Sequence, residues 1–320
     1  MAFAHTTVLR DPTAAAVAAG VRAALAVDRR GSPAGAVADC TLGGGGHSEA
    51  LLLALHDLPE VSVVGLDRDP QALAAATVRL AGFGSRFRAV HGRFGDLPGL
   101  LPGALLGVVA DLGVSSPQFD DADRGFSFRA DGPLDMRMDP TRGPTAADLL
   151  DSVRLEDLAD VLFQYGDIRR SIGTARIVLD EYSKGANTTA RLAERLAARL
   201  DRSRSLHPAT QVFQALRIWV NDEAAELERL LDDVPDRLAP GAALAVITFH
   251  SGEDRAVKHA FAQRARTDAF EVRERRGVVA DGAEVAANVR ARSARLRVLW
   301  RRTEFDLTRR SANIDDGENE

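Results

Sequence analysis

The chain of 320 residues contains a single cysteine, Cys40. One cysteine excludes an intramolecular disulfide and a cysteine zinc cluster, and it indicates a reducing compartment. No apolar run approaches the roughly 20 residues that a membrane-spanning helix needs. The N-terminal stretch MAFAHTTVLRDP also lacks the charged-then-apolar layout of a secretion signal. The sequence therefore predicts a soluble cytoplasmic protein that has no membrane partner.

Metal-binding motifs are missing as well. No C-x-x-C, H-E-x-x-H or calcium-loop spacing occurs, so we expect no metal. The composition is otherwise globular, with 45% hydrophobic and 27% charged residues. The formal net charge of -5 does not favour a protein that coats nucleic acid, although it leaves room for a local basic patch.

Short apolar runs alternate with helical patterns along much of the chain. This alternation predicts βαβ units, and hence an α/β fold with a parallel sheet. The predicted strands are residues 36–42, 61–66, 86–90, 105–112, 242–249 and 296–300, and the predicted helices between them are residues 11–29, 70–80, 210–232 and 254–266.

The alternation is interrupted between residues 113 and 206. Residues 113–138 are rich in Gly, Pro, Ser and Asp, which is typical of a long loop. The aromatic and apolar side chains of this loop indicate that it is ordered and functional. Residues 145–206 contain helical patterns and no strand. We therefore predict a core formed by residues 1–116 and 207–302, a loop and helical insertion at 117–206, and a frayed acidic tail at 303–320.

Four consecutive glycines, Gly43 to Gly46, follow the first predicted strand and precede a helical run. Glycines let a backbone approach a ligand closely. The dinucleotide fingerprint G-x-G-x-x-G is not met, because Ser48 or Glu49 stands where its last glycine belongs. No lysine follows as in a phosphate-binding loop. A flexible turn without a ligand is the alternative.

Asp67 ends the second predicted strand, about 20 residues beyond the glycines. Its carboxylate can accept hydrogen bonds from both hydroxyls of a ribose, or it can cap the helix that Pro70 opens. The glycines upstream favour a ribose-bearing cofactor. Nicotinamide dinucleotides and S-adenosylmethionine both qualify, and the missing third glycine favours S-adenosylmethionine, which has no pyrophosphate.

Two further candidate sites follow predicted strands. Asp111, Ser115 and Ser116 lie where open α/β sheets place ligands. They can orient an amine and draw off its proton, or they can simply form a Ser-Pro turn. His250 follows the 242–249 strand and can act as a base or an RNA contact, but for a lone histidine a structural hydrogen bond is the preferred interpretation.

Charge is unevenly distributed. Residues 259–302 contain eleven arginines and five acidic residues. Such an excess suits a patch that binds a phosphate backbone. A solvated helix face with a loop is the alternative, and for charge alone it is the preferred one.

Several of these segments together resemble one family, the bacterial 16S rRNA cytosine-N4 methyltransferases known as RsmH or MraW. The resemblance extends in the family's order from His5 to about Val298, and the string RGFSFR…GPLDMRMD is long and specific. The matching stretches are DCTLGGGGHS, VVGLDRDPQAL, DLGVSSPQFDDADRGFSFRADGPLDMRMD, HPATQVFQALRIWVNDE, ITFHSGEDRAVK and RSARLRV.

The resemblance implies a class I S-adenosylmethionine-dependent methyltransferase core (Rossmann-like) with an inserted helical domain that recognises the substrate. It also implies N4-methylation of a decoding-region cytidine in the 16S rRNA of the small ribosomal subunit. As cofactor contacts it implies Gly45, Gly46, His47, Asp67, Phe94, Asp111 and Gln118. For catalysis we expect Asp111, Ser115 and Ser116 as orienting acceptors, with His250 as a further candidate.

The chain departs from the family pattern at Asp167-Ile168, Gln211 and Gly252, and Gln211 replaces an arginine suited to phosphate. These departures keep one rival open, a non-catalytic cofactor-binding factor for ribosome assembly. A nicotinamide oxidoreductase is a second rival, which the missing glycine disfavours. The sequence leaves open whether the protein is a monomer or a homodimer. It also leaves open whether Arg124, Arg129 and Arg137 contact RNA or hold the long loop.

Overall fold

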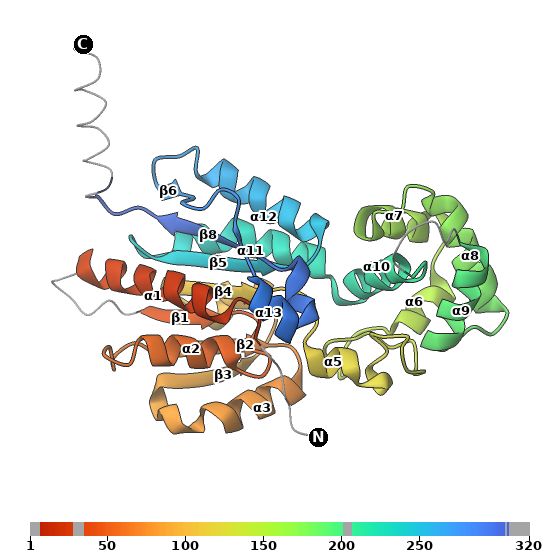
Figure 1. The fold of residues 1–320 in the computed structure, drawn as a ribbon, viewed down its shortest axis with the longest axis horizontal. Helices are drawn as coiled ribbons and strands as arrows, with labels where there is room; N and C mark the ends of the chain where they lie inside the picture. The colour runs from red at the N-terminus through yellow and green to blue at the C-terminus, as the bar shows by residue number, and fades with distance from the viewer. Residues whose placement is uncertain (1–6, 28–34, 201–206, 305, 307–320) are drawn as a thin grey trace, which may run out of the picture. The chain divides into compact units, whose positions relative to one another are not determined.

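The computed structural model describes residues 7–27, 35–200, 207–304 and 306. The chain forms two compact units, Met1–Gly113 with Ala225–Glu320, and Val114–Ala224. Each unit has a hydrophobic core of its own. Figure 1 shows the mixed sheet of the first unit and the helices of the second.

A single mixed sheet forms the first unit, with strand order β3-β2-β1-β4-β5-β8-β6 and with β7 also paired to β8. Strands β1 to β5 are parallel, whereas β8 is antiparallel to β5. The predicted α/β fold is confirmed. The strands are β1 (Gly35–Asp39), β2 (Val63–Asp67), β3 (Phe87–His91), β4 (Ala104–Asp111), β5 (Ala243–Thr248), β6 (Phe270–Glu271), β7 (Val278–Val279) and β8 (Arg295–Arg301).

Helices cover this sheet. Every residue of β5 is buried, and so is most of β4, which requires cover on both faces of the sheet. The helices are α1 (Arg10–Val27), α2 (Gly46–Ala54), α3 (Pro70–Leu80), α4 (Leu97–Leu100), α11 (Glu223–Arg237), α12 (Ser251–Arg264) and α13 (Gly282–Ala287), with short 3-10 turns η1 (Ala81–Arg86), η2 (Phe94–Asp96) and η4 (Val289–Ser293).

Helix α1 lies directly against the middle of the sheet. A Cβ added at Gly20 would lie 2.8 Å from the backbone nitrogen of Ala243 in β5. A Cβ added at Gly107 in β4 would lie 2.6 Å from Val17 of α1. The two glycines therefore permit a close approach that any other residue would prevent.

The carboxyl ends of the parallel strands meet at one edge of the sheet, the carboxyl edge. Asp39, Asp67 and Asp111 are the last residues of β1, β2 and β4. Strands β1 and β2 pair in register up to Asp39, and β1 pairs with β4 up to the same residue, with one register shift between Ala36 and Val37. Because open α/β sheets bind ligands at this edge, the topology brings three carboxylates to the expected place.

The second unit is helical, and its buried core is formed by apolar residues of the long loop and of the helices. Helix α10 packs its apolar face, which includes Val212 and Leu216, into this core. The helices are α5 (Ser116–Asp120), α6 (Ala146–Ser152), α7 (Leu155–Gly166), α8 (Ser171–Ser183), α9 (Thr189–Arg199) and α10 (Thr210–Asn221), with a 3-10 turn η3 (Ala122–Arg124).

These boundaries differ from those that the sequence suggests. Residues 207–224 were expected in the core, but they belong to the second unit because α10 packs there. The single helix predicted at 210–232 is two helices, since Asp222 has a left-handed φ of 54° between α10 and α11. Helix α11 also continues past Pro235 to Arg237. Residues 201–206 and most of the predicted tail at 303–320 lie outside the described residues.

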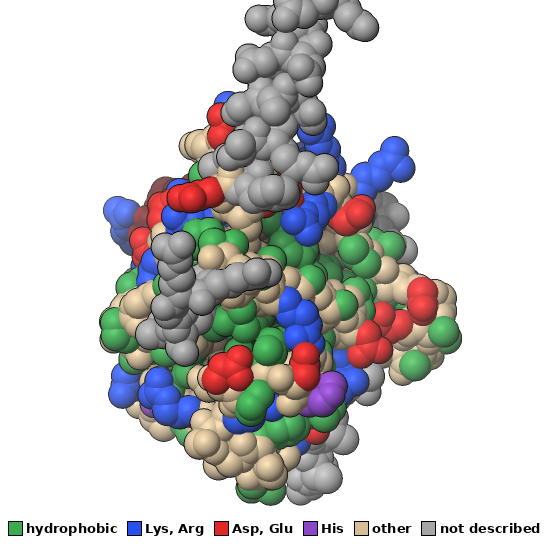
Figure 2. Space-filling model, turned by 90° about the vertical axis from the view of Figure 1, so that its left-hand side faces the viewer, with side chains coloured by type: hydrophobic (Ala, Val, Ile, Leu, Met, Phe, Trp, Pro, Cys, Tyr) green, Lys and Arg blue, Asp and Glu red, His purple; other side chains and the backbone are tan. Residues whose placement is uncertain are grey.

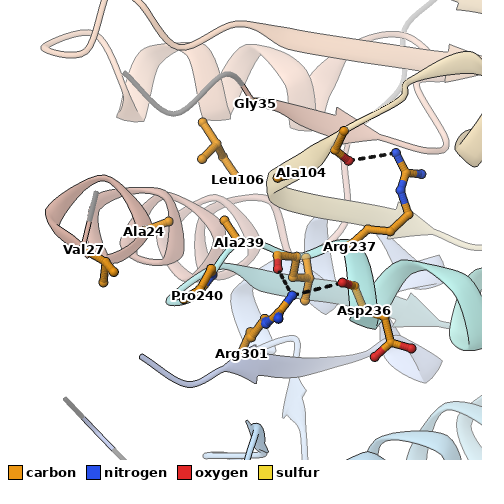
Figure 3. Close-up of a pocket in the computed structure, with 12 residues that line it drawn as sticks. Ala24, Val27, Gly35, Ala104, Leu106, Asp236, Arg237, Ala239, Pro240 and Arg301 are labelled. Carbon is orange, nitrogen blue, oxygen red and sulfur yellow. Dashed lines mark hydrogen bonds between the residues drawn. The ribbon is translucent and has the colours of Figure 1, made fainter. Parts of the chain in front are cut away.

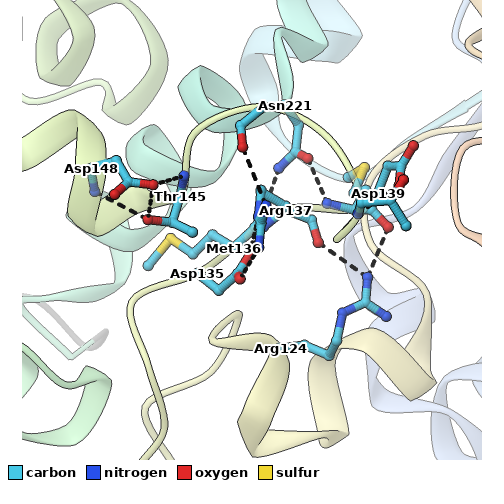
Figure 4. Close-up of polar contacts among 11 residues, drawn as sticks. Arg124, Asp135, Met136, Arg137, Asp139, Thr145, Asp148 and Asn221 are labelled. Atoms are coloured by element: carbon cyan, nitrogen blue, oxygen red, sulfur yellow. Dashed lines mark hydrogen bonds and ion pairs between the residues drawn. The ribbon is translucent and has the colours of Figure 1, made fainter.

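The long loop of the second unit is ordered by buried polar contacts, which Figure 4 shows. Asn221, with 4% of its surface exposed, accepts a hydrogen bond from Met138 N and donates one to Met136 O, both at 2.7 Å. Arg124 donates to the carbonyl oxygens of Arg137 and Met138 at 3.1 and 2.8 Å. Arg124 thus holds the loop, as one of the two predicted alternatives had it.

Arg137 also holds the loop. Its guanidinium forms two hydrogen bonds with the carboxylate of Asp135, at 2.9 and 2.7 Å, and a third with the carbonyl oxygen of Gly143. The side chain of Arg129 is exposed. Of the three arginines that the sequence leaves open, two have a structural role and Arg129 remains a candidate for RNA contact.

We predict that Asn221→Leu lowers the free energy of unfolding of this unit by about 2–4 kcal/mol. The change leaves a buried N–H and a buried carbonyl without partners, and each such loss costs roughly 1–3 kcal/mol. Urea unfolding measures the effect, and Glu194→Ala, on the exposed side of α9, is the control. A loss no larger than that of the control would contradict the role of Asn221.

Candidate functional site

The glycine-rich loop joins β1 to α2 and has a backbone that only glycine adopts readily. Gly43 and Gly45 have φ values of 49° and 81°, and Gly45 is the N-cap of α2. A Cβ added at Gly46 would lie 1.7 Å from Oγ1 of Thr7. The glycines therefore allow the chain to turn tightly after β1, so that the N-terminus of α2, with its backbone N–H groups, follows the carboxyl end of that strand.

Asp67 fixes this loop. Its carboxylate accepts hydrogen bonds from Gly43 N and from Asp69 N, each at 2.8 Å, with one bond to each oxygen. Burial raises the pKa of Asp67 to about 6, against the lowering effect of the two hydrogen bonds. Because a carboxylate oxygen has two lone pairs, each oxygen keeps one acceptor position for a ligand hydroxyl.

His47 and Asp111 face each other at the same edge. His47 Nε2 lies 3.4 Å from Asp111 Oδ2, and the side chain of His47 is 4% exposed. Within the described residues, both ring nitrogens of His47 and the Oδ1 atom of Asp111 are buried without a hydrogen-bond partner. Buried polar atoms without partners are costly, so this pair is suited to a polar ligand.

Asp39 belongs to the same group of side chains, and the sequence alone did not single it out. It is fully buried and accepts a hydrogen bond from Ser48 Oγ at 2.7 Å. Burial raises the pKa of Asp39, and the neighbouring His47 lowers it. Thr41 completes the connection, because its N–H donates to Asp39 and its hydroxyl accepts from Asp111 N. Asp39 ends a strand just before the glycines, and this position in the sequence is the signal that could have identified it.

Phe94 follows β3 in a turn that a second unpredicted residue holds in place. Glu226 of α11 is fully buried, and its Oε2 accepts a hydrogen bond from Gly95 N at 2.8 Å. Arg93, just before Phe94, has its Nη1 atom 3.6 Å from Glu226 Oε1. Arg68, just after Asp67, has its Nη2 atom 3.9 Å from Oε2. One carboxylate therefore ties together the chain segments next to Asp67 and Phe94.

Three predicted site residues lie in the second unit. Ser115 is the N-cap of α5 and accepts a hydrogen bond from Gln118 N, while Gln118 Oε1 accepts one from Ser115 N at 3.0 Å. Gln118 is buried, with 6% of its surface exposed. Ser116 is the first residue of the helix. Ser115 and Gln118 thus have a local structural role, the capping of α5.

His250 caps α12. Its Nδ1 accepts a hydrogen bond from Glu253 N at 3.4 Å, and its Nε2 lies 3.0 Å from Glu253 Oε1. Glu253 in turn accepts hydrogen bonds from Phe249 N and His250 N. The structural hydrogen bond that the sequence analysis preferred for His250 is therefore present, as the N-cap of α12. Cys40 is also structural, since it is buried and burial raises the pKa of its thiol.

A cavity of about 530 Å³ lies at the opposite edge of the sheet. It is lined by Gly35 and Ala104 at the starts of β1 and β4, and by Arg301 at the end of β8. Figure 3 shows Arg301 and Arg237 directed at backbone carbonyl oxygens, to which they donate hydrogen bonds. Neither Asp67 nor Asp111 lines this cavity.

The fold and the site together define a class of protein. A parallel sheet with one antiparallel strand beside β5, a glycine loop after β1 and an acidic residue ending β2 form a class I methyltransferase core. The family model described as the MraW methylase family matches residues 2–302, and the chain belongs to this family. The family recognised from the sequence is thus confirmed, and the methyl donor is S-adenosylmethionine.

Curated relatives agree with this assignment. The chain is 47% identical over 306 residues to the ribosomal RNA small subunit methyltransferase H of Prochlorococcus marinus (strain MIT 9303), which covers 93% of each chain. It is 44% identical over 299 residues to the protein of the same name from Picosynechococcus sp., covering 92% of this chain and 96% of the relative. The Bordetella pertussis protein of that name is 43% identical over 331 residues, covering 94% and 90%.

Solved structures match at lower similarity. An rRNA methylase from Streptococcus thermophilus is 11% identical with a TM-score of 0.41, covering 88% of this chain and 94% of that one. Within the described residues, no cluster of three or more His, Cys, Asp or Glu side chains could hold a metal ion. None of the described helices combines the length and the apolarity that crossing a membrane requires.

Asp67 predicts a pH dependence of cofactor binding. Its pKa is raised to about 6, so the charge of this carboxylate, which the sequence assigns to the ribose hydroxyls, is lost as the pH falls through that value. We expect affinity for S-adenosylhomocysteine to drop up to about tenfold between pH 7.5 and pH 5. Calorimetry measures it. Asp67→Asn should bind S-adenosylhomocysteine more weakly at pH 7.5 and should lack the part of the pH dependence that comes from Asp67. A wild-type affinity that is the same at pH 5 as at pH 7.5 would contradict the role of Asp67.

Proposed function

We propose that this protein methylates the N4 amine of a cytidine in the decoding region of 16S rRNA, acting on the small ribosomal subunit in the cytoplasm. Membership of the MraW methylase family carries the proposal. The names of the relatives, which specify ribosomal RNA of the small subunit, support the substrate class. The cytidine and its N4 atom come from the resemblance of the sequence motifs.

The side chains at the carboxyl edge fit the methyl donor. The two acceptor positions of Asp67 match the ribose hydroxyls. The unpartnered ring nitrogens of His47 match the charged methionine end. Gly45 and Gly46, at the start of α2, are assigned to the donor, and Phe94 is assigned to the adenine. The fit rests on buried polar atoms that need partners, which a plain flexible turn would not present.

S-adenosylmethionine carries its methyl group on a sulfonium, whose sulfur leaves readily as a neutral thioether. The nitrogen of the target amine forms a bond to the methyl carbon while the carbon–sulfur bond breaks, and the nitrogen then loses one proton. Asp111 is assigned to hold this amine, because its Oδ1 atom is a buried acceptor without a partner in the described residues. The proton passes to this carboxylate or to water.

Ser115 and Ser116 are proposed as further acceptors that orient the amine, and Gln118 as a contact to the donor. Ser115 can accept an additional hydrogen bond while it caps α5, because a hydroxyl oxygen has two lone pairs. His250 is proposed only as a weaker candidate, since its ring is engaged with Glu253. A target base that is stacked must leave its stack to reach such a site.

The decisive test uses small ribosomal subunits from cells that lack this protein. The subunits are incubated with the protein and radiolabelled S-adenosylmethionine, the RNA is digested, and the labelled nucleoside is identified. We expect label in N4-methylcytidine at one position. Label in another nucleoside would overturn the proposed target while leaving the methylase in place.

The non-catalytic assembly factor remains the second candidate, because Gln211 and Gly252 depart from the family pattern. It predicts donor binding without label in the RNA, and a cellular role that survives Asp111→Ala. The nicotinamide oxidoreductase is excluded by the family. A direct comparison of NADH and S-adenosylhomocysteine binding provides a further check on the donor.

A further inference from the structure

The arginines of residues 259–302 do not form one uniform patch. Several are engaged within the protein, and one, Arg273, also stacks 3.9 Å from the ring centre of Trp300. In the view of Figure 2, basic and acidic side chains are interspersed. The engaged pairs are Arg264 with Asp236, Arg273 and Arg302 with Glu271, and Arg301 with the carbonyl oxygens of Asp236 and Leu238.

A different group of cations has too few acidic partners, and we call it the basic cluster. It consists of Arg255 and Lys258 on α12, Arg275 and Arg276 in the turn between β6 and β7, and Arg295 and Arg297 on β8. The acidic residues among them are Asp254 and Glu274, which leaves an excess of four positive charges.

Asp254 is the centre of the basic cluster. Arg297, with 6% of its surface exposed, forms two hydrogen bonds with the carboxylate of Asp254, at 2.7 and 3.0 Å. Arg295 Nε lies 3.8 Å from the same carboxylate. One carboxylate is therefore shared by two guanidinium groups, so that the positive charge of Arg295 and Arg297 is only half compensated.

The same two arginines fix the turn above them. Arg297 donates a hydrogen bond to the carbonyl oxygen of Arg275 at 3.1 Å, and Arg295 donates one to that of Arg276. Gly277 completes the turn with a φ of 72°, and a Cβ there would lie 2.8 Å from Leu296 O. The turn is thus held close against β8.

The outer cations of the basic cluster are available to a ligand. The side chains of Arg255, Lys258, Arg275 and Arg276 are exposed. Among the described residues, none of these four side chains has an ion pair or a hydrogen bond. Lys258 interacts electrostatically with Asp254, so the three arginines are the cations best able to act on an anion, and their guanidinium groups suit phosphate oxygens.

The basic cluster stands at the carboxyl edge of the sheet. Arg295 pairs with Thr248, the last residue of β5, and α12 begins just beyond, at Ser251. Asp39, Asp67 and Asp111 end their strands at this same edge. An RNA whose target base reaches these residues would bring its backbone past this side of the first unit.

We propose that the basic cluster binds the phosphodiester backbone of the RNA substrate, with Arg275 and Arg276 as its outer contacts. The inference rests on the proposed function, which makes RNA the ligand of this edge. The contact is with phosphate and carries no sequence information, so it contributes affinity and orientation rather than choice of the target base.

The test measures binding of the full-length protein to small ribosomal subunits over a series of potassium chloride concentrations. For R275A/R276A we expect affinity at least about fivefold weaker and a salt dependence whose log–log slope is smaller by about 1.5–2. R275K/R276K should keep most of the slope, because it keeps both charges. Arg88→Ala, on the exposed edge strand β3, is the matched control and should bind as wild type.

The outcomes separate this inference from the proposed function. If R275A/R276A binds subunits with wild-type affinity and slope, the inference is overturned, whether or not the protein methylates them. If binding is weakened as expected and no label reaches cytidine, the proposed target fails and the surface stands. Equal loss of binding to acidic phospholipid vesicles and to RNA would overturn the assignment to RNA. Equal thermal stability of the variants excludes unfolding as the cause.

Discussion

Replacing Asp111 by alanine should lower the turnover number about 10²–10⁴-fold, the range that positioned proton acceptors contribute. Asp111 ends β4, its backbone N–H is fixed by the hydroxyl of Thr41 at 2.6 Å, and its Oδ1 atom is buried without a partner. The residue therefore has a fixed position, and its carboxylate presents an acceptor oxygen that no described residue uses. Single-turnover methylation of subunits at saturating S-adenosylmethionine measures the effect.

Two variants separate the possible roles of Asp111. Asp111→Asn keeps the shape and one acceptor oxygen but removes the charge, so it should slow methylation more than it weakens binding of S-adenosylhomocysteine. Asp57→Ala, which removes an exposed carboxylate paired with Arg22, should change neither. If Asp111→Ala turned over at the wild-type rate once the donor was saturating, Asp111 would be a contact to the donor and not an acceptor for the amine.

Replacing Glu226 by alanine should destabilise the first unit by about 2–4 kcal/mol. Breaking a buried charge pair costs roughly 3–5 kcal/mol, and we expect somewhat less because Arg93 and Arg229 are about half exposed. The loss leaves Arg68 and the N–H of Gly95 without this partner. Urea unfolding with the cofactor absent gives the value directly.

Glu226→Gln is the more informative variant for the cofactor. It keeps an acceptor for Gly95 N but removes the charge between the arginines. We expect weaker donor binding, seen as a higher KM for S-adenosylmethionine with a nearly unchanged kcat, because the residue acts on the segments that carry Asp67 and Phe94. Glu228→Ala, on the exposed side of the same helix, is the control. Unchanged stability and KM in both Glu226 variants would rule out this positioning role.

Local pattern was sufficient to predict the parallel strands and the first elements of the site. β2 and β4 end at Asp67 and Asp111 as expected, because apolar runs that stop at a polar residue mark buried strands. What the pattern could not give were contacts between distant parts of the chain. The hydrogen bond of Gly95 to Glu226 spans 131 residues, and no local feature distinguishes Glu226 from the exposed Glu228.

The arginine-rich segment also shows that sequence pattern does not predict tertiary contacts. A count of charges treats every arginine alike, yet Arg297 is buried on Asp254 whereas Arg275 and Arg276 are exposed above it. Arg255 and Lys258 lie outside the counted segment and still belong to the cluster. Likewise, helical periodicity encodes neither the left-handed φ of Asp222 that separates α10 from α11 nor the hydrogen bond of Asn221 to Met136 in the long loop.

The close approach of α1 to β5 at Gly20 has a consequence for the order in which the chain acquires its structure during synthesis. Residue 20 leaves the ribosome more than 200 residues before Ala243, the partner that its missing Cβ accommodates. The second unit, by contrast, is one continuous segment, Val114–Ala224. We therefore expect the helical unit to fold first, while α1 waits for β5 to close the sheet. Closing a sheet from segments far apart in the sequence is slow. We therefore expect the chain to be most prone to misfolding while the first unit is still incomplete.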